Sequence, residues 1–331
     1  MSYEKDGHIG WGEAAPGKNE KAETVEQMQE QLTTFLEGGI ESKNTEELNQ
    51  SAKKMGIAPC AFAALDIALW DWKAKKANVP LNQLLELPKP SVPTSLTLGI
   101  IPPEEVKERI HILFHYSSAK ALKIKLGSPD GIEADKQMFS QVLESTKQYK
   151  VKIRVDANGG WSTQEAIHMM RWLADRGVDY IEQPLEEGQE SELKYLYNNR
   201  PLPIYIDESC RYAEDVGKWA NHIDGVNIKL MKCGGITEAL EIIKNAKKYN
   251  LKTMIGCMSE SSVSIAAGAA ISGGIDHIDL DSHYNLAPDP GSGVQLIQGI
   301  TLPEFVPGHG ATLKPEYYLS LIHISEPTRP Y

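Results

Sequence analysis

The sequence lacks the features that would place the protein in a membrane or outside the cell. It contains no run of about 18 apolar residues, the length expected of a transmembrane helix. Residues 1–6 contain no apolar signal region. There are only four cysteines and none forms a C-x-x-C pair: Cys60, Cys210, Cys233 and Cys257. We therefore expect a cytoplasmic protein with buried thiols rather than disulfides, and no membrane partner.

The motifs of several familiar sites are also missing. No Gly-x-Gly-x-x-Gly follows a first strand, and there is no P-loop. The nine histidines show no H-x-x-H or H-E-x-x-H spacing, and no nucleophile elbow is visible. The formal net charge of -11, without a basic stripe, argues against nucleic acid as a partner. A small molecule is therefore the expected partner.

Helical patterns fill most of the first 90 residues, at about 22–37, 45–55 and 58–76. The third pattern ends before Pro80 and has a broad apolar face, made of Phe62, Leu65, Ile67, Ala68, Leu69 and Trp72. Residues 9–13 are typical of one edge strand, which needs partners to be stable. We therefore predict a partial, mostly helical domain over residues 1–90 whose first strands are missing.

Strands and helices alternate over residues 91–290, after a boundary rich in proline. Successive strands start roughly 20–30 residues apart, the period of a βα unit. Eight such strands predict a (β/α) barrel with its chemistry at the C-terminal strand ends, and a doubly wound open sheet is the alternative. The predicted strands lie near 94–98, 120–125, 151–155, 179–182, 203–207, 225–229, 252–256 and 277–280.

The alternation stops after about residue 290. Residues 291–320 are typical of loops and short strands, and we expect them to pack back on the N-terminal domain. Residues 321–331 fit neither pattern and resemble a non-native tail, so we leave them out of the fold prediction.

Three successive predicted strands each end on an acid: Asp156, Glu182 and Asp207. A single acid at a strand end is usually a turn former or a helix N-cap. Three in succession are hard to obtain from turn chemistry alone, and three converging carboxylates would repel each other unless a cation lay between them. Oxygen ligands suit Mg²⁺ or Mn²⁺ rather than Zn²⁺.

Lysines end the strands on either side of the three acids. Lys123 and Lys125 share one face of their strand, Lys229 ends another, and Lys232 follows in a loop. Lys123 and Lys125 are either solvated at a frayed strand end, or one depresses the pKa of the other to give a neutral amine base. In a closed barrel, Lys125 and Lys229 would flank the metal from opposite sides. This arrangement suits removal of an α-proton from a metal-bound carboxylate substrate, with return of a proton on the opposite face.

The last two predicted strands end in further acids. Met258 and Glu260 follow the seventh strand, and Glu260 either supports the site or forms a turn. Asp279 and Asp281 share one face of the eighth strand. This pair either binds a substrate ammonium group or serves as a turn acid and a helix cap.

These motifs occur in one order: Lys-x-Lys, Asp-x-Asn, Glu-Gln-Pro, Asp-Glu-Ser, Asn-Ile-Lys and Asp-x-Asp. In this order the chain resembles the enolase superfamily, muconate-lactonising subgroup, and within it the dipeptide epimerases of the L-Ala-D/L-Glu epimerase group. The resemblance covers roughly residues 9–320. It implies an α/β fold, a (β/α)7β TIM-like barrel with an α+β capping domain formed from both chain ends, with its N-terminal part truncated.

The resemblance also implies roles for the site residues. One Mg²⁺ per subunit, replaceable by Mn²⁺, would be held by Asp156, Glu182 and Asp207, with Asn158 and Glu208 as supporting residues. Lys125 and Lys229 would be the two acid/base catalysts. The implied substrate-binding residues are Lys123, which would also tune Lys125, Asp279 and Asp281, which would bind the dipeptide ammonium group, and Met258 and Glu260.

The implied activity is Mg²⁺-dependent epimerisation of a dipeptide at the α-carbon of its C-terminal residue, through an enediolate, with a role in peptidoglycan peptide metabolism. The resemblance leaves a homo-oligomer open. A dehydratase of the o-succinylbenzoate synthase type or an N-acylamino acid racemase is the alternative, because it uses the same metal and lysines without an ammonium site. A third hypothesis is a truncated barrel that binds metal or ligand without turnover, since relatives carry an N-terminal loop that closes over the substrate.

Overall fold

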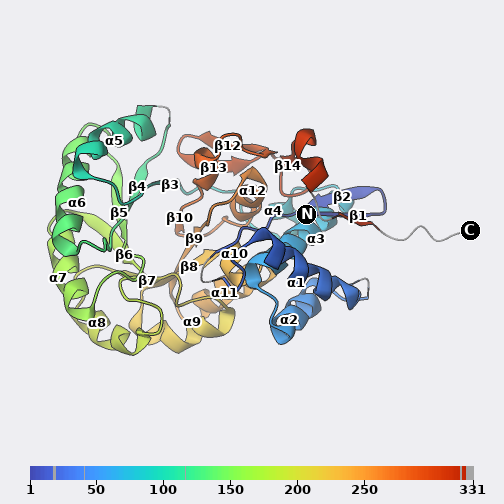
Figure 1. The fold of residues 1–331 in the computed structure, drawn as a ribbon, viewed down its shortest axis with the longest axis horizontal. Helices are drawn as coiled ribbons and strands as arrows, with labels where there is room; N and C mark the ends of the chain where they lie inside the picture. The colour runs from blue at the N-terminus through green and yellow to red at the C-terminus, as the bar shows by residue number, and fades with distance from the viewer. Residues whose placement is uncertain (18–19, 41, 116, 321–322, 326–331) are drawn as a thin grey trace, which may run out of the picture.

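The barrel is the larger part of the molecule, and its eight parallel strands follow each other around the sheet in chain order. The computed structural model describes residues 1–17, 20–40, 42–115, 117–320 and 323–325. A parallel bridge between Thr94 and Ile278 closes the ring, which Figure 1 shows on the left. The strands are β3 (Ser95–Leu98), β4 (Ala121–Lys125), β5 (Lys152–Asp156), β6 (Val178–Glu182), β7 (Ile204–Ile206), β8 (Gly225–Lys229), β9 (Lys252–Gly256) and β10 (His277–Ile278).

Seven helical connections surround the strands, so the predicted (β/α)7β barrel is confirmed and the open sheet is excluded. The short hairpin of β12 (Val294–Ile297) and β13 (Ile300–Pro303) follows β10 in place of an eighth outer helix. The outer helices are α5 (Val106–His115), α6 (Ile132–Thr146), α7 (Thr163–Ala174), α8 (Leu193–Asn199), α9 (Ala213–Trp219), α11 (Ile236–Lys248) and α12 (Ser262–Ala270). Short helical turns are η1 (Pro103–Glu105), η2 (Glu190–Glu192), η3 (Ala220–His222), α10 (Leu230–Cys233), η4 (Ser282–Asn285) and η5 (Pro315–Ser320).

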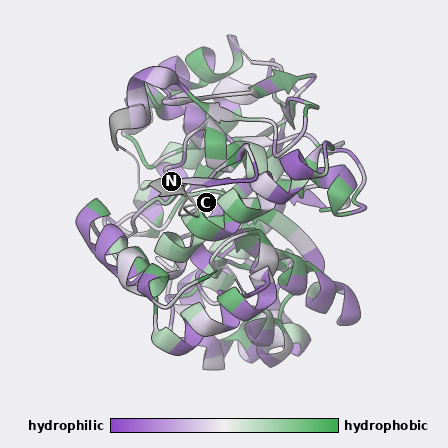
Figure 2. Cartoon of the chain, turned by 90° about the vertical axis from the view of Figure 1, so that its right-hand side faces the viewer, coloured by the Kyte–Doolittle hydropathy of each residue, from purple (hydrophilic) through white to green (hydrophobic). Residues whose placement is uncertain are grey.

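The outer helices form because each combines a start signal with one apolar face. In α7, Ser162 and Glu165 form a capping box, and the buried face consists of Ala166, Ile167, Met169, Met170 and Leu173. Figure 2 shows hydrophilic and hydrophobic segments alternating along such helices. Among the described helices, none is both long and apolar enough to cross a membrane.

The N-terminal end of the barrel is closed by large side chains. Tyr180 lies with its ring centroid 4.6 Å from that of Tyr205 and 4.8 Å from that of His277. Arg154 is buried beside them and donates to Ser95 Oγ over 2.7 Å. Because this end is packed, a small molecule can reach the barrel axis only from the C-terminal strand ends.

The capping domain contains a hairpin and three long helices. Strands β1 (Ser2–Lys5) and β2 (His8–Trp11) are antiparallel, and β15 (His323–Ser325) pairs in parallel with β1. The helices are α1 (Val25–Glu37), α2 (Thr45–Met55) and α3 (Pro59–Lys76), followed by the short α4 (Leu81–Leu84). The sequence predicted only one strand here, and it left out residues 323–325, which do join the sheet. Both strands are too short and polar to show a clear alternation.

Helix α3 connects the two domains. Its residues Ala64 and Ala68 face β2 so closely that a Cβ on Gly12 would lie 1.9 Å from the carbonyl oxygen of Ala64. The C-terminal segment packs on both domains: β13 lies against α12, and the backbone N–H of His309 donates to Asp71 of α3 over 2.8 Å. The segment also contains β11 (Gly291–Ser292) and β14 (Thr312–Leu313), which pair with each other.

Candidate metal centre and acid/base site

The three strand-end acids meet on the barrel axis. Strand pairing places Asp156 beside Glu182, and Asp207 comes directly after the next strand, β7. Each is fully buried, and one carboxylate oxygen of each lies within 4.8 Å of the others. Oxygens bound to one Mg²⁺ at about 2.1 Å would lie roughly 3–4 Å apart, so the cluster fits this ion after small movements. Asp207 Oδ2, moreover, is buried beside Lys229 Nζ and has no other hydrogen-bond partner among the described residues, so it can still serve as a ligand atom.

The charges of the cluster also suit a bound cation. Burial raises the pKa of Asp156 and Asp207, but the neighbouring lysines outweigh burial and lower both pKa values below the usual range. Burial and the Asp156 carboxylate raise the pKa of Glu182 to about 8. A divalent cation bound between the three acids would offset this repulsion and favour the ionised form of Glu182.

Lys125 and Lys229 lie at the two ends of the acid cluster. Lys125 Nζ is 2.6 Å from Asp156 Oδ2, and Lys229 Nζ is 2.5 Å from Asp207 Oδ2. Burial lowers the pKa of Lys229, but Asp207 and Glu208 outweigh it and raise the pKa. The two ammonium groups come from β4 and β8, with the three acid-bearing strands between them. This is the flanking arrangement that the sequence predicted.

Lys123 links the acid cluster to the Asp279–x–Asp281 pair. Its side chain is only 2% exposed, so the solvated reading is wrong for this residue. Its ammonium group contacts Asp279 and lies 3.3 Å from Glu182 Oε2 and 3.6 Å from Asp156 Oδ2. Burial lowers its pKa, but these acids outweigh burial and raise the pKa well above the usual range. Lys123 is therefore held as a cation. It cannot be the neutral amine base that the second reading of the Lys123 and Lys125 pair required.

The Asp279–x–Asp281 pair is buried and turned toward the barrel. Thr97 fixes it, because its backbone N–H donates to Asp281 Oδ2 over 2.6 Å and its hydroxyl to Asp279 Oδ1 over 3.3 Å. Burial and Asp279 raise the pKa of Asp281 to about 7. Asp281 precedes η4, but its side chain makes no capping hydrogen bond there. The reading as a turn acid and helix cap therefore does not account for this pair.

Glu260 accepts hydrogen bonds from residues close to it in the chain, between β9 and the start of α12. Its oxygens accept from the Met258 backbone N–H over 2.6 Å and from the Ser264 hydroxyl over 2.5 Å. Met258 itself is half-buried, and its terminal methyl lies near Gly17 of the capping domain. The contacts therefore favour the turn reading of Glu260, and they place Met258 between the barrel and the cap.

The two predicted supporting residues act differently from each other. The Asn158 backbone N–H donates to Asp156 Oδ1 over 2.9 Å, but the Asn158 side chain is exposed. Glu208 Oε2 is buried without a hydrogen-bond partner in the described part of the chain, and burial together with Asp207 raises its pKa. The backbone of Asn158 and the side chain of Glu208 are thus the parts next to the centre.

Three further residues, for which the sequence predicted no role, hold the carboxylates of the predicted metal ligands in place. The Gln183 side-chain carbonyl accepts from the Asp207 N–H over 2.8 Å, and the Asn227 amide donates to Glu182 Oε1 over 2.6 Å. Lys232 contacts Asp207 as well. Their polar character at buried strand ends was the only signal in the sequence.

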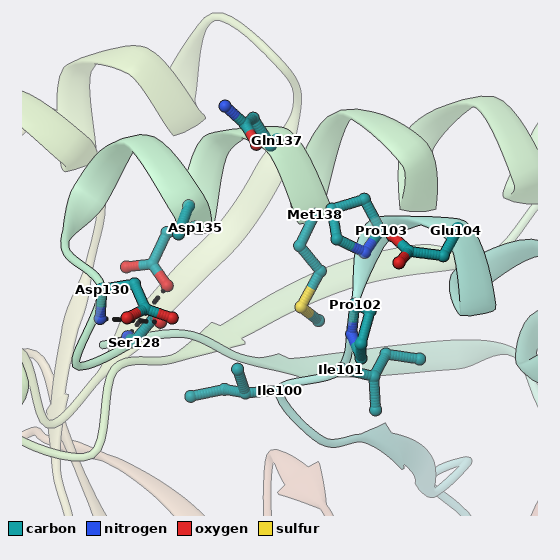
Figure 3. Close-up of a pocket in the computed structure, with 11 residues that line it drawn as sticks. Ile100, Ile101, Pro102, Pro103, Glu104, Ser128, Asp130, Asp135, Gln137 and Met138 are labelled. Atoms are coloured by element: carbon teal, nitrogen blue, oxygen red, sulfur yellow. Dashed lines mark hydrogen bonds between the residues drawn. The ribbon is translucent and has the colours of Figure 1, made fainter.

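A separate cavity of about 430 Å³ lies beside the site, between the β3–α5 loop and α6 (Figure 3). Asp135 at its edge accepts from the backbone N–H groups of Gly127 and Ser128, each over 3.0 Å. A Cβ on Gly127 would lie 2.3 Å from the carbonyl oxygen of Ala157. The loop after Lys125 is therefore fixed against the loop after Asp156. None of the three acids lines this cavity.

Comparison with family models gives two matches. The mandelate racemase/muconate lactonizing enzyme N-terminal domain matches residues 2–86, and the enolase C-terminal domain-like model matches residues 105–317. This chain belongs to the mandelate racemase/muconate lactonizing enzyme family of the enolase superfamily. The family assignment confirms the resemblance that the motifs indicated.

Several members of this family are similar to the chain over most of its length. A hydrophobic dipeptide epimerase of a Flavobacteria bacterium (strain MS024-2A) is 65% identical over 96% of this chain and 91% of that protein. A hydrophobic dipeptide epimerase of Roseobacter litoralis is 54% identical over 95% of this chain and 90% of that protein. The crystal structure of a dipeptide epimerase from Enterococcus faecalis, complexed with Mg and L-Leu-L-Tyr, is 33% identical, has a TM-score of 0.84, and covers 93% of this chain and 89% of its own.

Proposed function

We propose that this protein is a Mg²⁺-dependent dipeptide epimerase that inverts the α-carbon of the C-terminal residue. The observation that carries the proposal is the placement of Lys125 and Lys229 at opposite ends of the acid cluster. The resemblance to two hydrophobic dipeptide epimerases, at 65% and 54% identity, supports the substrate class. The assignment makes the protein an isomerase of the racemase and epimerase type.

The metal site would bind the substrate carboxylate. Asp156, Glu182 and Asp207 would hold Mg²⁺, which when bound supplies positive charge that stabilises the enediolate left by loss of the α-proton. Lys123 is buried as a cation next to two of these acids, so it would pair with the same substrate carboxylate and orient it.

The two flanking lysines would move the proton. An inverting reaction needs a base on one face of the carbon and an acid on the other, and β4 and β8 supply one lysine each. One lysine accepts the α-proton as a neutral amine, and the other donates a proton as an ammonium group. The two then exchange roles in the reverse direction.

The other end of the dipeptide would meet Asp279 and Asp281. These carboxylates are buried, and Lys123 connects them to the acid cluster. A free α-ammonium group would place its positive charge beside them, and Met258 would contact an apolar side chain. We propose a hydrophobic dipeptide as the substrate on this basis, and we expect a cytoplasmic enzyme. An assembly of several copies and a role in peptidoglycan peptide metabolism stay predictions.

Proton NMR in D₂O with Mg²⁺ tests the proposal, using hydrophobic dipeptides and L-Ala-L-Glu. The α-proton signal of the C-terminal residue should disappear while signals of the epimer grow. Lys125→Ala and Lys229→Ala should each reduce epimerisation about 10²–10⁴-fold, the contribution typical of general acid–base catalysis. Lys252→Ala, which removes a lysine at the opposite end of the barrel, is the control and should be fully active. Full turnover in both active-site variants would show that the two-lysine mechanism is wrong.

An N-acylated amino acid tests the alternative activity. The double variant Asp279→Ala, Asp281→Ala should lose activity on free dipeptides. Racemisation of an N-acylated substrate, with no dipeptide turnover in the wild type, would favour the acylamino acid racemase. A folded, Mg²⁺-binding protein without any exchange would support the non-catalytic barrel instead.

A further inference from the structure

Lys232 is a buried lysine that the proposed mechanism does not use. It lies in α10, the single helical turn directly after β8, and it is 2% exposed, although lysines are rarely fully buried unless paired. Gly234 and Gly235 end the turn with φ values of 96° and 115°. A Cβ on Gly235 would lie 2.4 Å from Asp66 Oδ2, so the turn is pressed against α3 of the capping domain. The turn therefore points the Lys232 side chain into the barrel rather than out of it.

The Lys232 ammonium group has an acceptor for each of its three N–H bonds. It donates to Asp207 Oδ1 over 2.7 Å, to the Asn227 carbonyl over 2.9 Å, and to the carbonyl of Asp207 itself. A lysine has only three donors, so no donor is left for a substrate. The contacts instead join Asp207, directly after β7, to Asn227 of β8.

These contacts give the two oxygens of Asp207 different roles. Oδ1 is held by Lys232, whereas Oδ2 lies 2.5 Å from Lys229 Nζ and has no other hydrogen-bond partner in the described part of the chain. The carboxylate therefore cannot rotate without losing a buried, charge-assisted hydrogen bond. Only one oxygen is left for the centre of the cluster.

We propose that Lys232 is a positioning residue, which fixes Asp207 so that Oδ2 alone serves the metal and meets Lys229. The catalytic part of the proposal rests on the proposed function. A purely structural lysine would lower the stability of the protein when removed, but it would change neither the Mg²⁺ affinity nor kcat. A positioning lysine changes both, because outer contacts of metal ligands typically contribute about 10–100-fold to metal affinity or activity.

The decisive variant is Lys232→Met, which keeps the length and apolar stem of the side chain and removes its donors. We expect the Mg²⁺ dissociation constant, measured by isothermal titration calorimetry without substrate, to rise about 10–100-fold. We also expect kcat at saturating Mg²⁺ to fall at least tenfold, with KM for the dipeptide changing less than threefold. The matched control is Asp66→Asn. It weakens the hydrogen bonds of Asp66 to Thr237 beside the same turn without touching Asp207, so Mg²⁺ affinity should stay within twofold of the wild type.

A second variant, Lys232→Gln, keeps N–H donors on a shorter side chain and should recover part of the Mg²⁺ affinity. Wild-type Mg²⁺ affinity and kcat in both Lys232 variants, with only a lower unfolding midpoint, would overturn the proposal. Failure of both variants to fold would also overturn it, because Lys232 would then be a residue of general stability. If the wild type epimerises no dipeptide, the proposed function fails, while the Mg²⁺ titration still decides the role of Lys232.

Discussion

Two buried carboxyl groups near the centre, Asp281 and Glu260, show how burial changes the chemistry of single residues. Burial raises the pKa of each to about 7, with a further contribution from Asp279 in the case of Asp281. Asp281 faces the site, whereas the oxygens of Glu260 are bonded to Met258 and Ser264, close to it in the chain. The same shift therefore predicts a change in catalysis for one residue and a change in stability for the other.

The activity on free dipeptides should depend on the ionisation of Asp281. We expect kcat/KM to rise as pH increases through about 7, because only the ionised carboxylate pairs with the substrate ammonium group. A pH profile of epimerisation between roughly pH 5.5 and 8.5 measures this. Asp281→Asn should raise KM at least tenfold, given about 1.5–3 kcal/mol for a charged hydrogen bond, and should remove the acidic limb. An unchanged limb in this variant would assign it to another group.

Loss of the Glu260 proton should make the protein less stable at higher pH. The folded pKa of about 7 lies above the ordinary value of 4.5, so the folded state binds the proton more tightly. The resulting stability is fully present below pH 4.5 and is lost as pH rises through 7, by about 3 kcal/mol. Glu260→Gln mimics the protonated group and should flatten this dependence in urea unfolding at several pH values. The exposed Glu144→Gln is the control and should leave the dependence as it is.

At the scale of elements, the close contact between β2 and α3 depends on glycines, which have no Cβ to hold the two backbones apart. A Cβ on Gly12 would lie 1.9 Å from the Ala64 carbonyl oxygen, and one on Gly10 would lie 2.0 Å from that of Ala68. Glu13, two residues after the end of β2, accepts from Ser261 and Ser264 at the start of α12. The segment of β2 and the two residues after it therefore links the cap to the start of α12.

Gly12→Ala should separate this strand from α3. The added methyl group forces the backbone of α3 to move, and we expect a loss of about 3 kcal/mol in the free energy of unfolding. Thermal unfolding followed by circular dichroism measures the loss. Gly99→Ala is the matched control, because a Cβ there meets no atom within 4 Å, and it should change stability little. Equal midpoints for the two variants would contradict the close packing.

The sequence predicted most elements correctly, and the exceptions have physical reasons. Long amphipathic helices and buried strands leave a periodic pattern, so the eight barrel strands and three capping helices lie within a few residues of their predicted positions. The strands β1 and β15 have three or four residues each and leave no such pattern. Their pairing partners, rather than their own residues, make them strands.

At the scale of the whole molecule, the acid cluster connects metal binding to stability. The three acids come from separate strands, so they are near each other only in the closed barrel. An ion that binds the folded chain alone must stabilise it.

Mg²⁺ should therefore raise the unfolding temperature, and its removal should abolish epimerisation. A concentration of 100 times the dissociation constant contributes about 2.7 kcal/mol, which corresponds to several degrees. Differential scanning calorimetry with Mg²⁺ and with EDTA measures the shift. Asp156→Asn should fold and show little shift. Full activity and an unchanged midpoint in EDTA would contradict the metal site.

The sequence by itself determined the barrel, the three acids, the flanking lysines and the Asp279–x–Asp281 pair, because buried strands and the residues at their ends are local in the chain. Only the tertiary structure decided which of these groups touch. It placed Lys123 between Asp279 and Glu182. It used Glu260 within its own loop and gave Asp207 a second lysine, Lys232. The contacts of Lys123 and Lys232 join residues far apart in the chain, so no local pattern encodes them, and burial then sets their charges.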